Sequence, residues 1–249
     1  MGPALKTDTQ LGQFRHLDRV LPPASAPAVG VVCALVDELG SLRDRATGRR
    51  RVQGFELLEL DLGGVPLLAC VSGVGKVRAA HATAALVAAG AGRALLVVGT
   101  CGGLRRELCP GALVHCTVAA QVDLAVREGR EVPSDPGLRA AWTAVAPGSE
   151  GWFLTADRPV LSPWRRLRLA RAFAGPCVAE METAAVAAVA RASGVPWAGL
   201  RAVTDGATFL GAREFRRHYP TCAGLAADTV ERLVTSDAFG SVAPRTGTR

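Results

Sequence analysis

Aromatic residues and metal-binding arrangements of cysteine and histidine are scarce in this sequence. Aromatic side chains make up 5% of the 249 residues, with a single tyrosine, and they do not alternate with basic residues as in nucleic-acid-binding segments. The seven cysteines are odd in number and form no CxxC pair, and the four histidines are scattered. We therefore expect no nucleic acid partner, no bound metal or other cofactor, and free thiols in a reducing cytoplasm.

Long uninterrupted apolar runs are also missing. The longest run of small apolar residues, around residues 79–99, contains His81 and Arg93, and the N-terminal segment lacks the apolar core of a signal peptide. The sequence therefore predicts a cytoplasmic protein with no membrane span. A formal net charge of +7 is compatible with anionic metabolites or with solubility alone.

Composition divides the chain into three parts. Residues 1–27, which end in PPASAP, are expected to be a poorly ordered extension, and residues 236–249 a loose tail. Residues 28–235 are expected to form one catalytic domain, because the chain is 49% apolar and long enough to bury a core.

Strand-like and helix-like segments alternate along this domain. Apolar runs predict strands over residues 28–35, 94–100, 112–120, 151–157, 177–180 and 195–205, with a hairpin over 55–73 that turns at Gly63-Gly64. Helices are predicted over residues 37–46, 76–90, 134–146, 162–174, 181–194 and 212–234, the last broken near Pro220. This alternation predicts an α/β fold, a single domain with a mixed, mostly parallel central sheet flanked by helices.

Polar residues collect where the apolar strands end, and active sites of such sheets lie at that edge. Glu38 follows the first strand, Thr100 and Gly102 follow the apolar residues 94–99, and Asp205 ends the run over 195–205. Each also has a simpler explanation: a helix N-terminus for Glu38, a tight turn for Thr100 and Gly102, and a helix cap for Asp205. Each residue alone is therefore weak evidence of a site.

The stretch VAEMETAAVA, residues 178–187, carries two carboxylates in an apolar context. On a helix that begins near Met181, Glu182 shares a face with Val186 and Val189, which is the apolar face. A favourable helix dipole does not require an inward carboxylate, so we expect Glu182 to accept hydrogen bonds from a hydroxylated ligand.

Together these motifs resemble one family. The segments GVGKVRAA, VVGTCGGL, VAEMETAAVA and LRAVTDGA occur in the order typical of the nucleoside phosphorylase and nucleosidase superfamily, over about residues 29–234. The closest resemblance is to 5′-methylthioadenosine/S-adenosylhomocysteine nucleosidases. The resemblance implies a nucleoside phosphorylase-like fold, cleavage of the N-glycosidic bond of a purine nucleoside such as 5′-methylthioadenosine or S-adenosylhomocysteine, and a homo-oligomer.

The resemblance also implies roles for the residues of the EME motif. Glu182 is similar to the glutamate that binds the ribose 2′- and 3′-hydroxyls. Met181 is similar to the methionine packed against the ribose, and Glu180 to its supporting neighbour. The same resemblance makes Asp205 the acid that delivers a proton toward purine N7, with Thr204 and Arg201 beside it.

Further matches surround the sugar and the base. Glu38 resembles the glutamate that activates water, Val160 supplies backbone groups that could read the base, and the water or phosphate side is lined by Thr100, Cys101 and Gly102. Such chemistry needs carboxylates because cleavage builds positive charge on the ribose and negative charge on the base, which a protonated acid relieves.

Hydrolysis is favoured over phosphorolysis. Phosphorylases of this superfamily usually place an arginine, a phosphate clamp, where this sequence has Val97, and a Gly-Asp-Pro-x-Arg-like loop where it has ALVDEL. Arg105 and Arg106 lie past the glycine loop, although they or a neighbouring subunit's arginine remain a possible clamp.

Three departures leave the substrate open. Pro159 replaces the phenylalanine that commonly stacks on adenine, Thr208 replaces a second acid of the SDxAD motif, and residues 119–135 do not resemble the segment that helps enclose the 5′ substituent. The alternatives are a phosphorylase, a specialised relative acting on futalosine or adenosylhopane, and a non-catalytic nucleoside-binding protein. Retention of Glu38, Glu182 and Asp205 together argues against the last.

Overall fold

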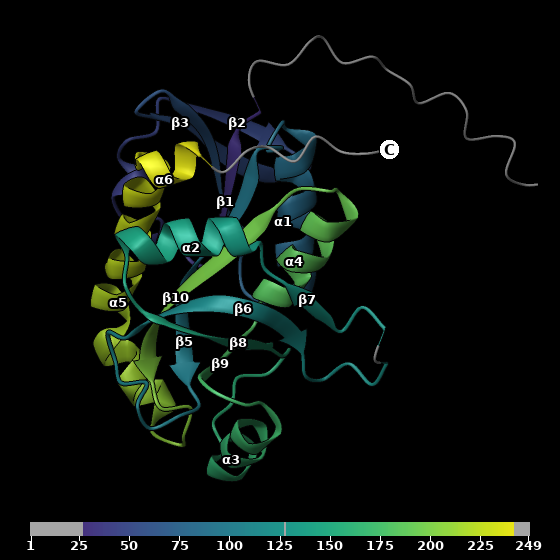
Figure 1. The fold of residues 1–249 in the computed structure, drawn as a ribbon, viewed down its shortest axis with the longest axis vertical. Helices are drawn as coiled ribbons and strands as arrows, with labels where there is room; N and C mark the ends of the chain where they lie inside the picture. The colour runs from purple at the N-terminus through teal and green to yellow at the C-terminus, as the bar shows by residue number, and fades with distance from the viewer. Residues whose placement is uncertain (1–26, 127, 242–249) are drawn as a thin grey trace, which may run out of the picture.

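The computed structural model describes residues 27–126 and 128–241. Strands and helices alternate along them (Figure 1), as the sequence predicts. The strands are β1 (Val29–Cys33), β2 (Gly48–Val52), β3 (Phe55–Leu62), β4 (Val65–Val71), β5 (Ala94–Gly103), β6 (Leu113–Gln121), β7 (Glu131–Pro133), β8 (Ser149–Thr155), β9 (Cys177–Glu180) and β10 (Trp197–Asp205). The helices are η2 (Val36–Arg43), α1 (Lys76–Ala88), α2 (Pro136–Val145), α3 (Pro163–Ala172), α4 (Thr183–Ala192), α5 (Gly211–Val234) and α6 (Asp237–Gly240).

The sheet is mixed, as the sequence predicts, but it is not mostly parallel and it is not an open sheet. Among the described residues, β1–β4, β1–β5, β5–β10, β6–β8 and β8–β9 pair in parallel, whereas β2–β3, β3–β4, β5–β9, β6–β7 and β6–β10 pair antiparallel. Moreover, β5, β10, β6, β8 and β9 close into a ring.

The length of β5 explains the closure. Its first residues, 94–97, pair with β1, and its last two, Gly102 and Gly103, extend past β1 and pair with β9 on that same side. The other edge of β5 pairs with β10 along nearly its whole length. A run of apolar residues indicates a buried strand but not which strands are its neighbours. The strand pairing could therefore not be predicted from the sequence pattern.

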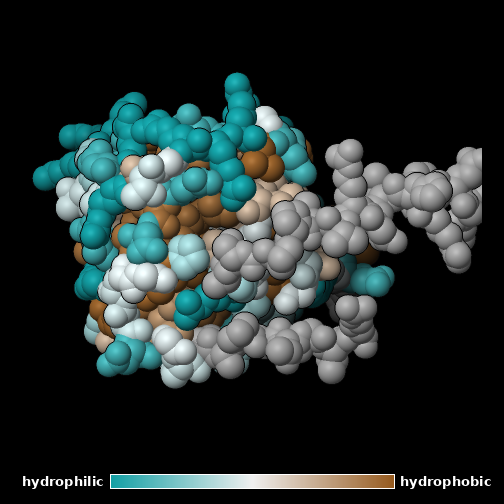
Figure 2. Space-filling model, turned by 90° about the horizontal axis from the view of Figure 1, so that it is seen from above, coloured by the Kyte–Doolittle hydropathy of each residue, from teal (hydrophilic) through white to brown (hydrophobic). Residues whose placement is uncertain are grey.

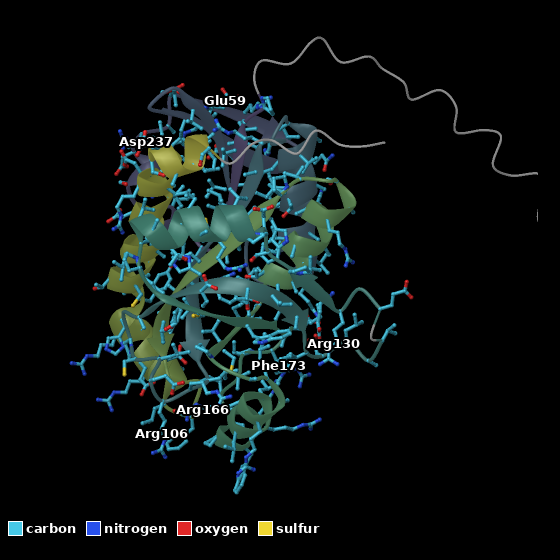
Figure 3. All side chains as sticks on the ribbon, viewed as in Figure 1. Glu59, Arg106, Arg130, Arg166, Phe173 and Asp237 are labelled. Atoms are coloured by element: carbon cyan, nitrogen blue, oxygen red, sulfur yellow. The ribbon has the colours of Figure 1, made fainter. Side chains whose placement is uncertain are left out.

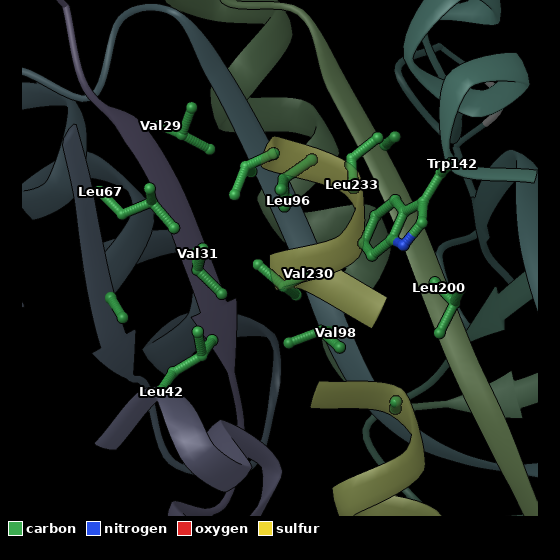
Figure 4. Packing of buried hydrophobic residues seen from close by; sticks show 14 of the residues in the cluster. Val29, Val31, Leu42, Leu67, Leu96, Val98, Trp142, Leu200, Val230 and Leu233 are labelled. Carbon is green, nitrogen blue, oxygen red and sulfur yellow. The ribbon is translucent and has the colours of Figure 1, made fainter. Parts of the chain in front are cut away.

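Two apolar clusters lie on opposite faces of the sheet. One contains Trp142 of α2 with Val230 and Leu233 of α5, packed on residues of β1, β4, β5 and β10 (Figure 4). The indole nitrogen of Trp142 donates to the hydroxyl of Thr229 at 3.0 Å, which satisfies its polar group in the core. The other cluster contains the inward faces of α1 and α4. The sheet is thus covered on both faces, and its strand ends carry the site.

Local signals in the sequence located most element ends. Gly63 and Gly64 have φ of 63° and 84°, as the two central residues of the predicted hairpin turn require. Asp135 caps α2 by accepting from the amide of Leu138 at 2.9 Å, and Ser162 caps α3. The predicted hairpin turn is confirmed, because it depends on neighbouring residues alone.

Three local predictions are wrong. Residues 36–43 form a 3-10 helix interrupted at Gly40, whose φ is 48°. Helix α5 runs through Pro220 without a break, because the face of the helix that follows the proline is buried in the core. Residues 236–241 of the expected tail are ordered: Ser236 caps α6, and Phe239 is buried with the guanidinium of Arg93 4.6 Å from its ring.

The remaining expectations for the chain ends fall on residues 1–26 and 242–249, which lie outside the described residues. Seen from the end that bears β2, β3 and α6, hydrophilic side chains border an area where hydrophobic ones reach the surface (Figure 2). Within the described residues, none of the helices has the length and apolar character needed to cross a membrane.

Candidate active site

A cavity of about 320 Å³ lies at the carboxyl ends of β1, β5, β9 and β10. All of the residues that the sequence predicts for the site line this cavity: Glu38, Thr100, Cys101, Gly102, Val160, Glu180, Met181, Glu182, Arg201, Thr204 and Asp205. They come from segments as far apart as residues 38 and 205, which confirms that the strand ends meet at one place.

Arg201 is the centre of a buried ion-pair cluster. Its side chain is 2% exposed, and its Nη2 donates to Glu180 at 2.9 Å, to Glu182 at 3.1 Å and to the hydroxyl of Thr183 at 3.3 Å. Its Nη1 donates to the carbonyl of Thr100 at 3.0 Å. Burial disfavours the charge, but the nearby carboxylates outweigh burial and raise the pKa of Arg201, so the guanidinium stays charged.

Glu180 is occupied by protein donors. Its Oε2 accepts from the amides of Glu182 at 2.9 Å and Thr183 at 2.7 Å, besides Arg201, and its Oε1 accepts from the hydroxyl of Thr155. Because Thr183 begins α4, these bonds satisfy orphan amides at the helix N-terminus. Glu180 therefore fixes the end of β9 against α4 and offers little to a ligand.

Glu182 has a different environment, although it lies two residues away. It is the N-cap residue of α4, but its side chain turns to the cavity, where Oε1 accepts from the amide of Gly75 at 2.9 Å and Oε2 from Arg201. Burial raises the pKa of Glu182, with Arg201 opposing and Glu180 reinforcing the shift. Both oxygens keep acceptor capacity, so Glu182 can receive hydroxyl donors from a ligand.

The glycine loop GVGK contributes a hydrogen-bond donor, the amide of Gly75, to the site. Gly75 has φ of 105° and lies directly before α1, so its N–H is free of the helix ladder. It binds a carboxylate of the protein itself, Glu182, from another part of the chain.

Glu38 is held by four protein donors at the start of η2. Oε2 accepts from the amides of Ala34 at 3.0 Å and Leu35 at 3.1 Å, and Oε1 from both the amide and the hydroxyl of Thr100 at 2.9 Å. A methyl group on Gly99 would lie 2.7 Å from Oε1, so this glycine makes room for the carboxylate. A water bound to Glu38 must donate to a carboxylate oxygen that already accepts a hydrogen bond from the protein. Of these donors, the Thr100 hydroxyl can rotate away from Glu38 to make room for the water.

Asp205 closes the opposite end of the site, at the end of β10. Its Oδ1 accepts from the amide of Ala207 at 2.8 Å, and its Oδ2 from the hydroxyl of Thr204 at 2.8 Å. Burial raises the pKa of Asp205, and the bonds from Thr204 and Ala207 only partly oppose the shift. A carboxyl group with a raised pKa can hold a proton closer to neutral pH, as a general acid must.

Several cavity residues were missed by the sequence analysis. Leu35, Val74, Leu161 and Phe215 line the cavity with apolar surface. Phe215 lies near the start of α5, where many of its neighbours are basic. The periodicity of the helix does not distinguish Phe215 from apolar residues of the core. Only the path of the chain brings it to the strand ends.

Positive charge in the cavity comes from Arg158 and Arg201. Arg105 does not line it but donates to the carbonyls of Phe173 and Gly175. Arg106 is likewise not among the lining residues and lies at the same end of the molecule as Arg166 and Phe173 (Figure 3). Val97 is fully buried in the core. Because Arg201 is already paired, the described residues provide no buried free guanidinium in the cavity to clamp a phosphate.

The ring-closed α/β fold with carboxylates at its strand ends has a known counterpart. The chain belongs to the phosphorylase superfamily, whose sequence model matches residues 28–235.

Within that superfamily, the chain is similar to nucleosidases. It is 27% identical to the 5′-methylthioadenosine/S-adenosylhomocysteine nucleosidase of Shewanella halifaxensis over 198 residues, which cover 72% of this chain and 86% of the relative. The crystal structure of the corresponding Neisseria meningitidis nucleosidase with methylthio-immucillin-A superposes with a TM-score of 0.78 at 26% identity, covering 84% of this chain and 98% of that chain. These relatives confirm the resemblance to nucleosidases that the sequence predicts.

A second structure shows how widely this fold is shared. The futalosine hydrolase of Helicobacter pylori superposes with a TM-score of 0.79 at 21% identity, covering 84% of this chain and 97% of that chain. At this identity the likeness concerns the fold alone.

Proposed function

We propose that this protein hydrolyses the N-glycosidic bond of an adenosine-type purine nucleoside, of which 5′-methylthioadenosine and S-adenosylhomocysteine are the first candidates. The observation that carries the proposal is the placement of Glu38, Glu182 and Asp205 around one cavity. Each carboxylate has a different set of partners, which suits three different tasks.

The three carboxylates divide the reaction among them. Asp205, protonated, gives its proton to the base as the bond from the base nitrogen to the ribosyl carbon breaks. Glu182 accepts hydrogen bonds from the ribose hydroxyls and so orients the sugar. Glu38 accepts a proton from the water that adds to the ribosyl carbon, and the products are a free purine base and a free sugar.

Hydrolysis is supported by what surrounds Glu38. A phosphate nucleophile would bring negative charge next to Glu38, whose donors are backbone amides and one hydroxyl rather than a guanidinium. Water brings no charge and can donate to the carboxylate. The apolar lining from Leu35 and Phe215 supports a substrate whose ribose carries an at least partly apolar substituent, such as a thioether.

A nucleoside panel incubated with and without phosphate tests this proposal. We expect cleavage of adenosine-type nucleosides in phosphate-free buffer with release of free sugar, and loss of this activity in Glu38→Ala. A rate that rises in proportion to phosphate, with ribose 1-phosphate as product, would establish phosphorolysis instead. Binding of a nucleoside without turnover would identify a non-catalytic binding protein.

A further inference from the structure

Asp205 precedes a short connection that leads directly into α5. Within this connection, Ala207 is buried and has φ of 52°, a left-handed conformation that is unfavourable for a residue with a side chain. This turn brings the amide of Ala207 to Oδ1 of Asp205. The direction of the Asp205 carboxyl group therefore depends on how firmly the connection is held.

Two side chains of α5 hold the peptide groups on either side of Asp205. Oε2 of Glu214 accepts from the amide of Gly206 at 2.9 Å, and Nδ1 of His218 lies 3.0 Å from the carbonyl oxygen of Thr204. A carbonyl oxygen only accepts, so Nδ1 carries the proton. Glu214 and His218 are four residues apart and therefore on one face of the helix.

Thr208, within the connection, does not hold the peptide groups beside Asp205. It occupies the position of the second acid in the nucleosidase motif, but its hydroxyl accepts from the amide of Leu210 at 3.3 Å. The carboxylate beside Asp205 comes from Glu214 instead, one helical turn into α5.

We propose that Glu214 and His218 are positioning residues that fix the orientation of the Asp205 carboxyl group for proton transfer to the leaving base. This inference rests on the proposed function, in which Asp205 is the general acid. Neither residue lines the cavity, so both act through Asp205 and its backbone.

The two residues also act on Asp205 through their charges. After burial and the bonds from Thr204 and Ala207, the negative charge of Glu214 raises the pKa of Asp205, and a positive charge on His218 lowers it. Other titratable or charged groups line the same cavity as Asp205: Cys101 of β5, Arg201 of β10, Glu38 of η2 and Arg158 after β8. Substitution of Glu214 leaves all of these groups in place.

Substitutions at Glu214 distinguish its hydrogen bond to Gly206, which positions Asp205, from the effect of its negative charge on the pKa of Asp205. Glu214→Ala removes both, and we expect kcat to fall by about 10²-fold with little change in KM, because a displaced catalytic group loses rate rather than binding. Glu214→Gln keeps an acceptor for the Gly206 amide, so most of kcat should return. In Glu214→Gln, the alkaline limb of the kcat/KM profile should move to lower pH. Without the negative charge of Glu214, the pKa of Asp205 falls, and Asp205 loses its proton at lower pH.

His218 gives a parallel pair. His218→Asn keeps a donor near the Thr204 carbonyl and should retain most of kcat, whereas His218→Ala should lose more. Glu231→Gln is the matched control on the same helix, because Glu231 pairs with Arg45. We expect it to leave kcat and the pH profile as in the unsubstituted protein.

Wild-type kcat and an unchanged alkaline limb in Glu214→Ala and Glu214→Gln would overturn this inference while leaving the proposed function standing. If Glu214→Ala does not fold, the Glu214→Gln limb and the two His218 variants still decide the matter. A wild-type protein that cleaves no nucleoside would overturn the proposed function and this inference together.

Discussion

Asp205 lies buried at the end of β10, where its protonated form is less disfavoured than that of a carboxyl group in water. Burial raises its pKa, and we propose that the proton it holds is the one transferred to the base. We expect Asp205→Asn to fold normally and to lose more than the roughly 10²–10⁴-fold typical of a general acid if the residue also contacts the base. Turnover assays with circular dichroism as a check on folding measure this, and near-wild-type turnover would exclude Asp205 from the mechanism.

The same pKa shift predicts a pH dependence. A general acid works only while it is protonated, so kcat/KM should fall as pH rises through the raised pKa of Asp205. The alkaline limb should disappear in the residual activity of Asp205→Asn, whose side chain does not titrate. A limb that persists unchanged in that variant belongs to another group.

Glu182 should be sensitive to the sugar. Its oxygens face the cavity while its partners are Gly75 and Arg201, so a ribose hydroxyl can bind without displacing either. Glu182→Gln should weaken binding of ribonucleosides by about 1.5–3 kcal/mol, the cost of a charged hydrogen bond, and affect 2′-deoxynucleosides much less. Isothermal titration with matched ribo and deoxy analogues tests this, and equal losses for both sugars would show a structural role alone.

The carboxylates could be predicted from sequence because each stands beside an apolar run and because their motifs together resemble a known family. Their partners could not. That Glu180 is saturated by Thr155, Thr183 and Arg201, whereas Glu182 is available, depends on which strands meet at β9. The positions of Glu180 and Glu182 in the sequence, two residues apart, do not indicate which of the two carboxylates is available to a ligand.

At the scale of single elements, α5 shows how packing overrides a local signal. Pro220 lacks an N–H and costs about 3 kcal/mol in a helix interior, yet the helix runs on because Cys222, Ala226 and Val230 bury its inward face. Pro220→Ala should raise the free energy of unfolding by about 1–3 kcal/mol, measured by chemical denaturation. Arg217→Ala, at another exposed position of the helix, is the control and should change it little; an unchanged or lower stability in Pro220→Ala would show that the proline fits its site without cost.

The strand pattern has a similar limit. The sequence located β1, β5, β6, β8, β9 and β10 and the hairpin of β3 and β4, because buried strands leave apolar runs in the sequence. It missed β2, whose residues 49–51 are three arginines, and β7, which is three residues long. An edge strand exposed to water has no apolar signature, so only its pairing reveals it.

At the scale of the whole molecule, an apolar patch at the start of α1 predicts self-association. Val74 and Val77 are exposed there, Val77 by 84%, and the exposed Val126 follows three residues after Asp123, which forms an ion pair of 2.7 Å with Lys76 of α1. Light scattering should give a mass of at least twice the chain's 25.8 kDa. Val77→Glu should reduce it, whereas Leu167→Glu on α3 should not; a wild-type monomer would contradict the prediction.

The balance of charge around Arg201 has a consequence for the cell's stock of adenine compounds. With Asp205 protonated, the cavity wall holds the carboxylates of Glu38, Glu180 and Glu182 against the guanidiniums of Arg201 and Arg158, an excess of negative charge that attracts a sugar turning cationic and repels a phosphate ester. Adenosine monophosphate should therefore neither be cleaved nor compete with a nucleoside substrate at comparable concentration, which a simple inhibition assay would show. If nucleosides are its substrates, as we propose, repulsion at the sugar would let the enzyme work among abundant nucleotides and leave them intact.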